Sequence, residues 1–252
     1  MLRALSDLMS RQTLEGVVGA LAALSLRAMI GNVVIASAGT LLLAVALGRP
    51  DTVAAGLFYL VNSTLATAAL FLLADRVRAA RGDAQDGMHP ALFGAGRVNH
   101  AWLGTLFFVL AVSAAGMPPL AGFIGKALLL QAAGQTPWAG AIVAVILASS
   151  LLMMVAFARS GSTLFWKPVD MAAPSQAATP LAGNPPDAER AVPACRSHAA
   201  SLMLLAALIA ACAVFAGPLF TYTQATAQQL FERQAYLRAV LSAQPVPAEY
   251  DV

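Results

Sequence analysis

The sequence predicts an all-α fold: a polytopic bundle of transmembrane helices in which one helix is discontinuous. Hydrophobic residues make up 59% of the 252 residues and charged residues only 11%, whereas soluble domains carry about 25% charged residues. The apolar residues gather in stretches of about 20, the length that a helix needs to cross a bilayer. A double proline interrupts one of these stretches. These observations predict an integral membrane protein with a broken helix.

The first half of the chain contains two predicted spans. Residues 1–26 are expected to form an N-terminal segment with only part of a helix, because their apolar run is too short to cross a membrane alone. The predicted transmembrane core covers residues 27–158. It begins with a span at 28–48, with Arg27 at its mouth, and a second span follows at 53–74.

Residues 101–133 form one apolar stretch that is interrupted in its middle. As a continuous helix it would be about 50 Å long, against a hydrocarbon core of about 30 Å. Two short spans joined by a tight turn are an alternative, but each half would be only about 21–24 Å long. Prolines remove backbone donors and clash with the preceding turn, while glycines loosen the chain. We therefore expect a single crossing by a broken helix, with the break shaped by Gly116, Pro118, Pro119, Gly122 and Gly125.

The remainder of the chain alternates between apolar and polar segments. Residues 139–158 are a further predicted span, and 159–199 are expected to form a proline-rich loop, as its composition favours a flexible segment. Residues 200–221 make the last predicted transmembrane helix. The C-terminal tail, 222–252, is expected to carry an amphipathic surface helix at 224–241.

Loop charges predict the orientation of these spans. The loops at 75–100 and 159–199 hold most of the basic residues outside the spans. By the positive-inside rule both loops are cytoplasmic and the C-terminus lies outside. This holds only if the broken helix counts as one crossing, so the charge asymmetry supports the break independently.

Lys126 lies just after the break, in an otherwise apolar segment, and is one of two lysines in the chain. A lysine at the bilayer centre costs roughly 2.5–3.5 kcal/mol on insertion scales, and such charges usually face a protein interior or a hydrated pathway. Snorkelling to the membrane surface is the alternative, but it suits helix ends, whereas apolar residues flank Lys126 on both sides. We expect Lys126 to lie on an ion or proton route.

Three segments resemble one known family. The motif from Gly116 to Lys126 is similar to the signature of antiporter-like proton-conducting subunits, which the membrane arm of respiratory complex I shares with the Mrp multisubunit cation/proton antiporters. Residues 27–39 and 58–71 resemble two further helices of these subunits. Segments that favour the D-type subunit of the Mrp antiporters over complex I are 63–71, 159–167 and 236–241.

The resemblance implies a membrane subunit of a Na⁺(K⁺)/H⁺ antiporter in a bacterial cell (inner) membrane, with the other antiporter subunits, the lipid bilayer, protons and Na⁺ or K⁺ as partners. It covers only the C-terminal half of the family's usual length. In the family the motif forms the break of a discontinuous helix, and the residue at the position of Lys126 relays protons. A buried lysine can do so because desolvation disfavours its charged form. We expect no enzyme activity of its own, no cofactor, no metal and no nucleic acid.

Other residues are weaker candidates. Ser37, Ser63 and Thr67 could line a water path, although small hydroxyl residues in membrane helices more often bond to backbone carbonyls or allow close packing. Arg27 cannot deprotonate, so an electrostatic or anchoring role is favoured for it over a relay. Complex I relatives carry a histidine and a lysine at the positions of Ser63 and Thr67.

Two alternatives remain open. A non-conducting structural or truncated fragment would explain the half length. A proton-pumping membrane component of the complex I (an NADH-quinone oxidoreductase) or hydrogenase type is disfavoured by Ser63 and Thr67.

Overall fold

The computed structural model describes residues 2–81, 88, 100–137, 139–166, 196–232, 237–238 and 240–241. Within these residues every regular element is a helix, which confirms the all-α prediction. The elements are α1 (Leu2–Ala22), α2 (Leu26–Ala46), α3 (Pro50–Arg81), α4 (His100–Ala115), α5 (Ala121–Ala133), α6 (Ala139–Gly161), the π-helix η1 (Ser162–Trp166), α7 (Arg196–Val214) and α8 (Ala216–Phe231).

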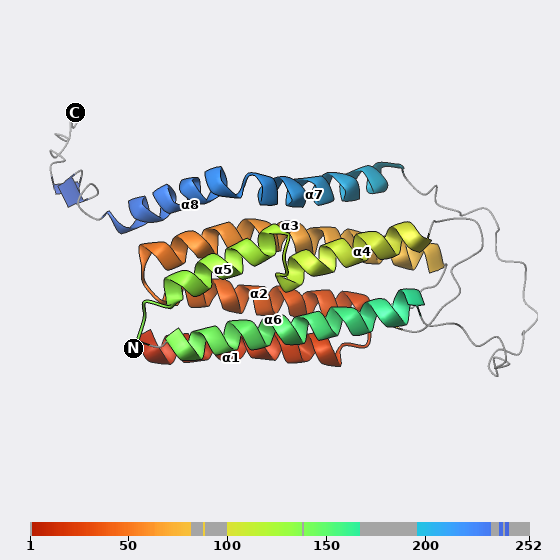
Figure 1. Ribbon diagram of the computed structural model, residues 1–252, viewed down its shortest axis with the longest axis horizontal. Helices are drawn as coiled ribbons and strands as arrows, with labels where there is room; N and C mark the ends of the chain where they lie inside the picture. Colours follow the sequence, from red (N-terminus) through yellow and green to blue (C-terminus); the bar gives the residue numbers. More distant parts are fainter. Residues whose placement is uncertain are drawn as a thin grey trace, which may run out of the picture.

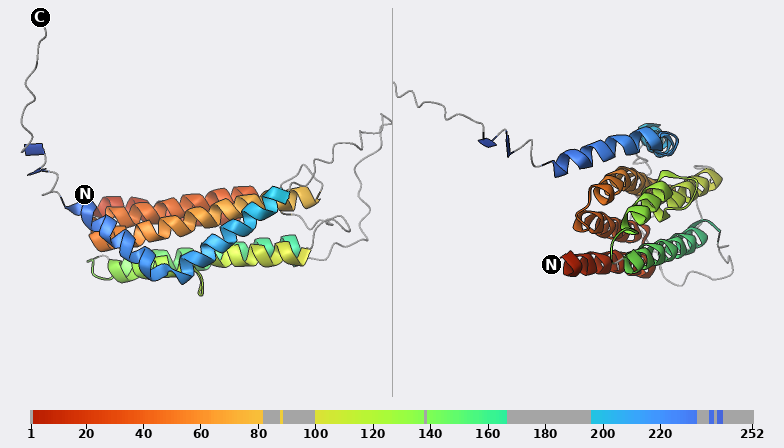
Figure 2. Two further views of the ribbon diagram at one scale, coloured as in Figure 1. Left: turned by 90° about the horizontal axis from the view of Figure 1, so that it is seen from above. Right: turned by 60° about the vertical axis from the view of Figure 1, so that its left-hand side comes forward.

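The helices lie side by side and alternate in direction (Figure 1). Helices α4 and α5 lie end to end and together cover the length that α3 or α6 covers alone. The predicted discontinuous helix is therefore present, and its two halves make one passage along the bundle. Helices α7 and α8 cross the bundle obliquely on one side (Figure 2).

Three helical segments are long and apolar enough to cross a membrane: Leu26–Ala46, Pro50–Ala79 and Ala139–Phe165. The pair α7 and α8 adds a fourth if the two are counted as one bent span. The apolar parts of α4 and α5 are each shorter than a full span. They reach span length only when joined across the break.

The structure differs from the sequence prediction at the N-terminus. In place of a partial helix, residues 2–22 form a complete helix of 21 residues. Val17 and Ala20 are buried in the main hydrophobic core, and they belong to the face of α1 that packs on its neighbours. Charged residues interrupt the apolar pattern of α1, so hydropathy alone does not predict this helix. Its packing against neighbouring helices stabilises it.

A second difference lies at the C-terminal end. The predicted single span at 200–221 is bent by 80° between α7 and α8, and α8 runs on to Phe231, through the start of the predicted surface helix at 224–241. Pro218 falls in the first turn of α8, where a missing backbone N–H costs no helical hydrogen bond. The predicted loop at 159–199 is helical at both flanks, and its middle lies outside the described residues.

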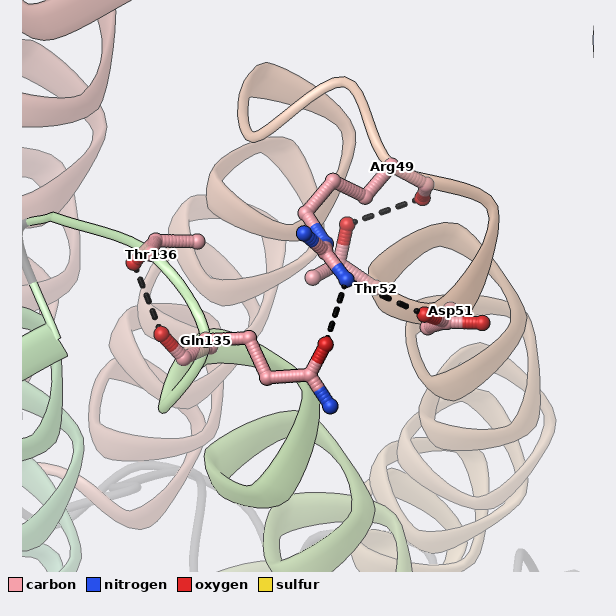
Figure 3. A network of polar contacts seen from close by, with 6 residues as sticks. Arg49, Asp51, Thr52, Gln135 and Thr136 are labelled. Atoms are coloured by element: carbon pink, nitrogen blue, oxygen red, sulfur yellow. Dashed lines mark hydrogen bonds and ion pairs between the residues drawn. The ribbon is translucent and has the colours of Figure 1, made fainter.

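The ends of the bundle are fastened by polar contacts. At one end Arg27 pairs with Asp75, and the Arg159 guanidinium donates to the carbonyl oxygens of Leu21 and Ala23 at the end of α1. At the other end Arg49, in the turn between α2 and α3, contacts Gln135 in the turn between α5 and α6 (Figure 3). Its guanidinium donates to Gln135 Oε1 at 2.7 Å and to Asp51 Oδ2 at 3.3 Å.

Helices α1 and α2 approach closely at Gly16. A Cβ atom at this position would lie 2.8 Å from Ala36 Cα and 2.9 Å from the Asn32 carbonyl oxygen. Both are backbone atoms of α2, so only a shift of one helix could make room. Close packing of small residues is a main source of helix association in membranes.

We expect Gly16→Ala to destabilise the protein by roughly 1–3 kcal/mol, the usual cost of overpacking. Gly31→Ala is the matched control, because Gly31 also lies within a helix and a Cβ there meets nothing within 4 Å. Thermal unfolding in detergent checks both variants. Equal melting temperatures for the two would contradict the close approach.

Candidate functional site

The break between α4 and α5 begins with a regular helix terminus. Gly116 has a positive φ of 79°, a conformation that glycine adopts without strain. Its N–H donates to the Ser113 carbonyl at 3.2 Å, and the Met117 N–H donates to the Val112 carbonyl at 3.0 Å. These two bonds form a Schellman motif, the common C-terminal cap of helices. Gly116 therefore ends α4, and the chain turns before the two prolines.

Pro118 and Pro119 lie between the helices, joined by a cis peptide bond, and α5 begins at Ala121. Gly122 lets the first turn of α5 approach the last turn of α4. A Cβ atom there would collide with the Ser113 carbonyl oxygen and lie 3.0 Å from Asn62 Nδ2. Gly125 sits against α3 in the same way, where a Cβ would lie 3.2 Å from Tyr59 Cα.

Lys126 extends from α5 back towards the break and is buried, with 9% of its surface exposed. Its Nζ donates to the Ala115 carbonyl oxygen at 2.8 Å. Ala115 is the last residue of α4, so this carbonyl has no partner within its own helix. A cation at a helix C-terminus is also favoured by the helix dipole. The ammonium thus caps the end of α4.

A second contact joins Lys126 to α6. Its Nζ donates to Ser150 Oγ at 2.9 Å, and the Ser150 hydroxyl donates to the Ile146 carbonyl at 2.8 Å. The neighbouring Ser149 hydroxyl also donates to Ile146, at 2.9 Å. An ammonium has three donors, so two of them join α4 and α6 and one remains for another acceptor.

A small cavity lies beside Lys126, with room for about one water molecule. Helices α1, α2, α3 and α6 surround it, and α4 contributes Ala114. No carboxylate is among its lining residues in the described part of the chain. The hydroxyl-bearing residues that line it are Thr13, Ser37, Thr40, Tyr59 and Ser149.

A second, narrower cavity shares Ser37, Tyr59 and Ala114 with the first and reaches Asn62, Ser63 and Thr67. It leaves no room for a water molecule. The Tyr59 hydroxyl donates to Ser37 Oγ at 3.3 Å where the two cavities meet. The polar side chains that line these two cavities, from Thr67 on α3 to Lys126 on α5, are called the polar track below.

The structure brings Ser37, Ser63 and Thr67 to this track. The Ser63 hydroxyl donates to the Leu60 carbonyl and the Thr67 hydroxyl to the Ser63 carbonyl, at 3.1 and 2.7 Å. Arg27 lies elsewhere: it lines neither cavity and pairs with Asp75 at the end of the bundle.

Sequence reasoning missed several residues of the track. Tyr59 and Asn62 are buried polar residues on α3, and Asn62 Oδ1 accepts from Ser113 Oγ at 3.1 Å. The Ser149–Ser150 pair was visible as two adjacent hydroxyls within an apolar span. From the sequence, however, two adjacent hydroxyls do not show which residue each of them contacts. The fold shows that Ser150 faces Lys126.

A broken helix with a buried lysine at its break is typical of antiporter-like membrane subunits. The family model described as "NADH:quinone oxidoreductase/Mrp antiporter, TM" matches residues 9–152, more than half of the chain. The chain belongs to this family of membrane proteins.

Two curated relatives are antiporter subunits. The chain is 30% identical over 256 residues to the D subunit of a probable K(+)/H(+) antiporter of Rhizobium meliloti, covering 90% of this chain and 44% of the relative. It is 33% identical over 151 residues to the D subunit of the Na(+)/H(+) antiporter of Bacillus subtilis, covering 60% and 30%.

Among solved structures, the Mrp complex from Dietzia sp. DQ12-45-1b matches with a TM-score of 0.75 and 25% identity, over 96% of this chain and 49% of that one. Respiratory complex I from Thermus thermophilus has the same fold, with a TM-score of 0.67. The chain therefore spans at most about half the length of the proteins it matches here.

We expect Lys126→Met to destabilise the protein by roughly 1–3 kcal/mol, because it leaves a buried carbonyl without a donor. Lys126→Gln keeps a donor and should lose less. Thermal unfolding in lipid nanodiscs compares the two variants with the wild type. If both variants unfold at the wild-type temperature, the ammonium does not stabilise the break.

Proposed function

We propose that this chain is a D-type component of a Na⁺ or K⁺/H⁺ antiporter, in which Lys126 carries a proton at the helix break. The observation behind this proposal is the place of Lys126 in a chain of this family. The ammonium is buried, bonded to the broken helix and next to a cavity lined by hydroxyls. Lysines in such surroundings mark ion and proton routes.

The contacts of Lys126 suggest how a proton moves. In the charged state the ammonium donates to Ala115 and Ser150, and its remaining N–H is available to a water in the adjacent cavity. Loss of the proton to that water leaves a neutral amine with a lone pair. The Ser150 hydroxyl can then turn from the Ile146 carbonyl and donate to the amine.

Proton loss also weakens the cap of α4. A neutral amine is a poorer donor than an ammonium, and its attraction to the helix dipole disappears. The charge on Lys126 is thereby linked to the conformation of the break and to α6. Such a link is what an antiporter needs to couple proton movement to that of a cation.

The topology supports the orientation proposed from the charges. Helices α3 and α6 end, and α4 and α7 begin, at the same end of the bundle, whereas α8 ends at the other (Figure 1). We place the α3–α4 and α6–α7 connections in the cytoplasm and the C-terminus outside, in a bacterial cell membrane. The other antiporter subunits are the proposed partners.

A second candidate function is a non-conducting membrane component. It is favoured by the second cavity, which leaves no room for a water molecule between Thr67 and the cavity beside Lys126. In that case Lys126 serves only to cap α4. A complex I-type role is less favoured, because Ser63 and Thr67 offer hydroxyls and no titratable group.

The proposal is tested by cation/proton exchange in everted vesicles from antiporter-deficient cells that express the chain with its neighbouring subunits. We expect Lys126→Ala, Lys126→Arg and Lys126→Gln to lose exchange. Arginine keeps the charge but does not release its proton, and glutamine keeps a donor but cannot be charged.

Immunoblots of the vesicles serve as the control for insertion. Mutants that insert normally and exchange at the wild-type rate would overturn the relay role of Lys126. Wild-type vesicles without exchange above background would favour the non-conducting alternative.

Ser150→Ala should lower exchange by roughly ten- to a hundredfold, since a hydrogen bond to a charged group contributes about 1.5–3 kcal/mol. Ser149→Ala is the matched control: both serines donate to the Ile146 carbonyl, but only Ser150 has a bond to Lys126. The same vesicle assay measures both. A larger loss with Ser149→Ala would exclude this role for Ser150.

A further inference from the structure

Three hydroxyls that line the cavity beside Lys126 have already used their hydrogen atoms. Thr13 on α1 and Thr40 on α2 each donate to the carbonyl four residues earlier in the same helix, at 3.1 and 3.0 Å. The Tyr59 hydroxyl on α3 donates to Ser37 Oγ at 3.3 Å. A hydroxyl has one hydrogen and two lone pairs. These three oxygens therefore have only lone pairs left to offer the cavity.

The two threonines are held in place by the close packing of α1 on α2. Thr13 and Thr40 are only 2% and 4% exposed, so both lie inside the bundle. Thr13 fills the space that Gly39 leaves on α2, because a Cβ atom at Gly39 would lie 2.6 Å from Thr13 Oγ1 and 2.7 Å from the Thr13 backbone nitrogen. The positions of these oxygens are therefore fixed by the helices that carry them.

A cavity lined by acceptors suits a cation. While Lys126 is charged, its third N–H supplies the positive group. Once the proton has left, the lone pairs of the hydroxyls face a neutral amine. Hard cations bind to oxygen atoms, and uncharged oxygen dipoles can replace the hydration shell of a monovalent ion. The cavity has room for about one water molecule, which is space for a single ion without its water.

Among the described residues that line the cavity, Lys126 is the only one that carries a charge. The lining residues come from α1 to α6, and Tyr59 is the only other titratable one. Arg11 and Glu15, the charged residues nearest to Thr13 on α1, are exposed at the surface of the protein. The protonation state of Lys126 therefore decides whether a cation in the cavity meets a like charge.

We propose that this cavity binds one alkali metal cation without its water shell, and that the cation and the proton of Lys126 exclude each other. When Lys126 gives its proton to the cavity water, the departing hydronium leaves space for a cation. When the ammonium forms again, two like charges repel each other at short range in a medium of low dielectric constant, and the cation leaves. The proposal rests on the proposed function, since it needs a proton to leave Lys126, and it adds where the exchanged cation binds.

The test uses the Lys126→Gln variant, purified in lipid nanodiscs, because glutamine cannot be charged and leaves the cavity without an ammonium. Equilibrium binding is measured with radioactive Na⁺ and, as a tracer for K⁺, radioactive Rb⁺. We expect saturable binding of at least one of these ions. Unlabelled alkali chloride should displace it, whereas choline chloride at the same ionic strength should not.

Variants of the threonines place the ion in the cavity. In the Lys126→Gln background, Thr13→Val together with Thr40→Val removes two oxygens with little change of shape and should lower the affinity roughly tenfold or more. Thr52→Val is the matched control and should leave the affinity unchanged. Thr52 is also buried and also donates to a backbone carbonyl, that of Arg49 at 3.0 Å, but it lies at the end of the bundle. Thermal unfolding checks that each variant is folded, and Thr40→Val alone replaces a double variant that is not.

The wild type tests the exclusion between cation and proton. Adding NaCl or KCl to weakly buffered nanodiscs should release protons, followed with a pH-sensitive dye, because two ligands that oppose each other do so reciprocally. The Lys126→Gln variant should bind the cation without releasing protons. Choline chloride should release protons from neither protein.

The cation site is wrong if Lys126→Gln binds neither ion saturably, if folded threonine variants keep its affinity, or if the wild type binds a cation without releasing protons. Cation/proton exchange in vesicles is measured separately. Exchange by the wild type with no binding to Lys126→Gln would refute the cation site and leave the proposed function standing. Binding with proton release but no exchange would do the reverse.

Discussion

The centre of the protein depends on the hydrogen bond from Lys126 to the Ala115 carbonyl. A helix that stops inside a membrane leaves carbonyl groups without partners, and a charged amine inside a membrane lacks water. Each is costly alone. Here the ammonium satisfies the carbonyl and the end of the helix stabilises the charge. The break and the lysine therefore make each other tolerable, and neither is expected to persist in this position without the other.

The same contact fixes what surrounds it. For Lys126 to reach back to α4, the first turn of α5 must lie against the last turn of α4, and Gly122 permits this by presenting no side chain to Ser113. Ser150 on α6 then accepts a second hydrogen bond from the ammonium. Three helices converge on one nitrogen atom. A site of this kind responds as a unit, because no one of its helices can move without changing a bond to that atom.

Features that depend on local chemistry could be predicted from the sequence. The double proline and Gly116 indicate a break, and a lone lysine in an apolar run indicates a buried charge. Ser37, Ser63 and Thr67 could be named from the sequence as candidates for a water path, but the complete track could not, because its residues come from separate helices and meet only through packing. Tyr59 and Asn62 show the difficulty, since each is an ordinary member of an apolar helix until α4 and α2 are placed beside it. Likewise, α1 was underestimated because its charges mask a well-packed inner face.

The contact between Arg159 and the end of α1 has a consequence for biogenesis. Helix α1 is not among the described segments that are apolar enough to cross a membrane by themselves. Its close packing on α2 at Gly16 lets the more apolar α2 assist its insertion into the bilayer. The carbonyls of Leu21 and Ala23, at its end, however, accept hydrogen bonds from Arg159 of α6, which the ribosome makes more than a hundred residues later. Helix α1 is thus synthesised well before α6, the helix that completes its packing, and until then its contact within these residues is with α2.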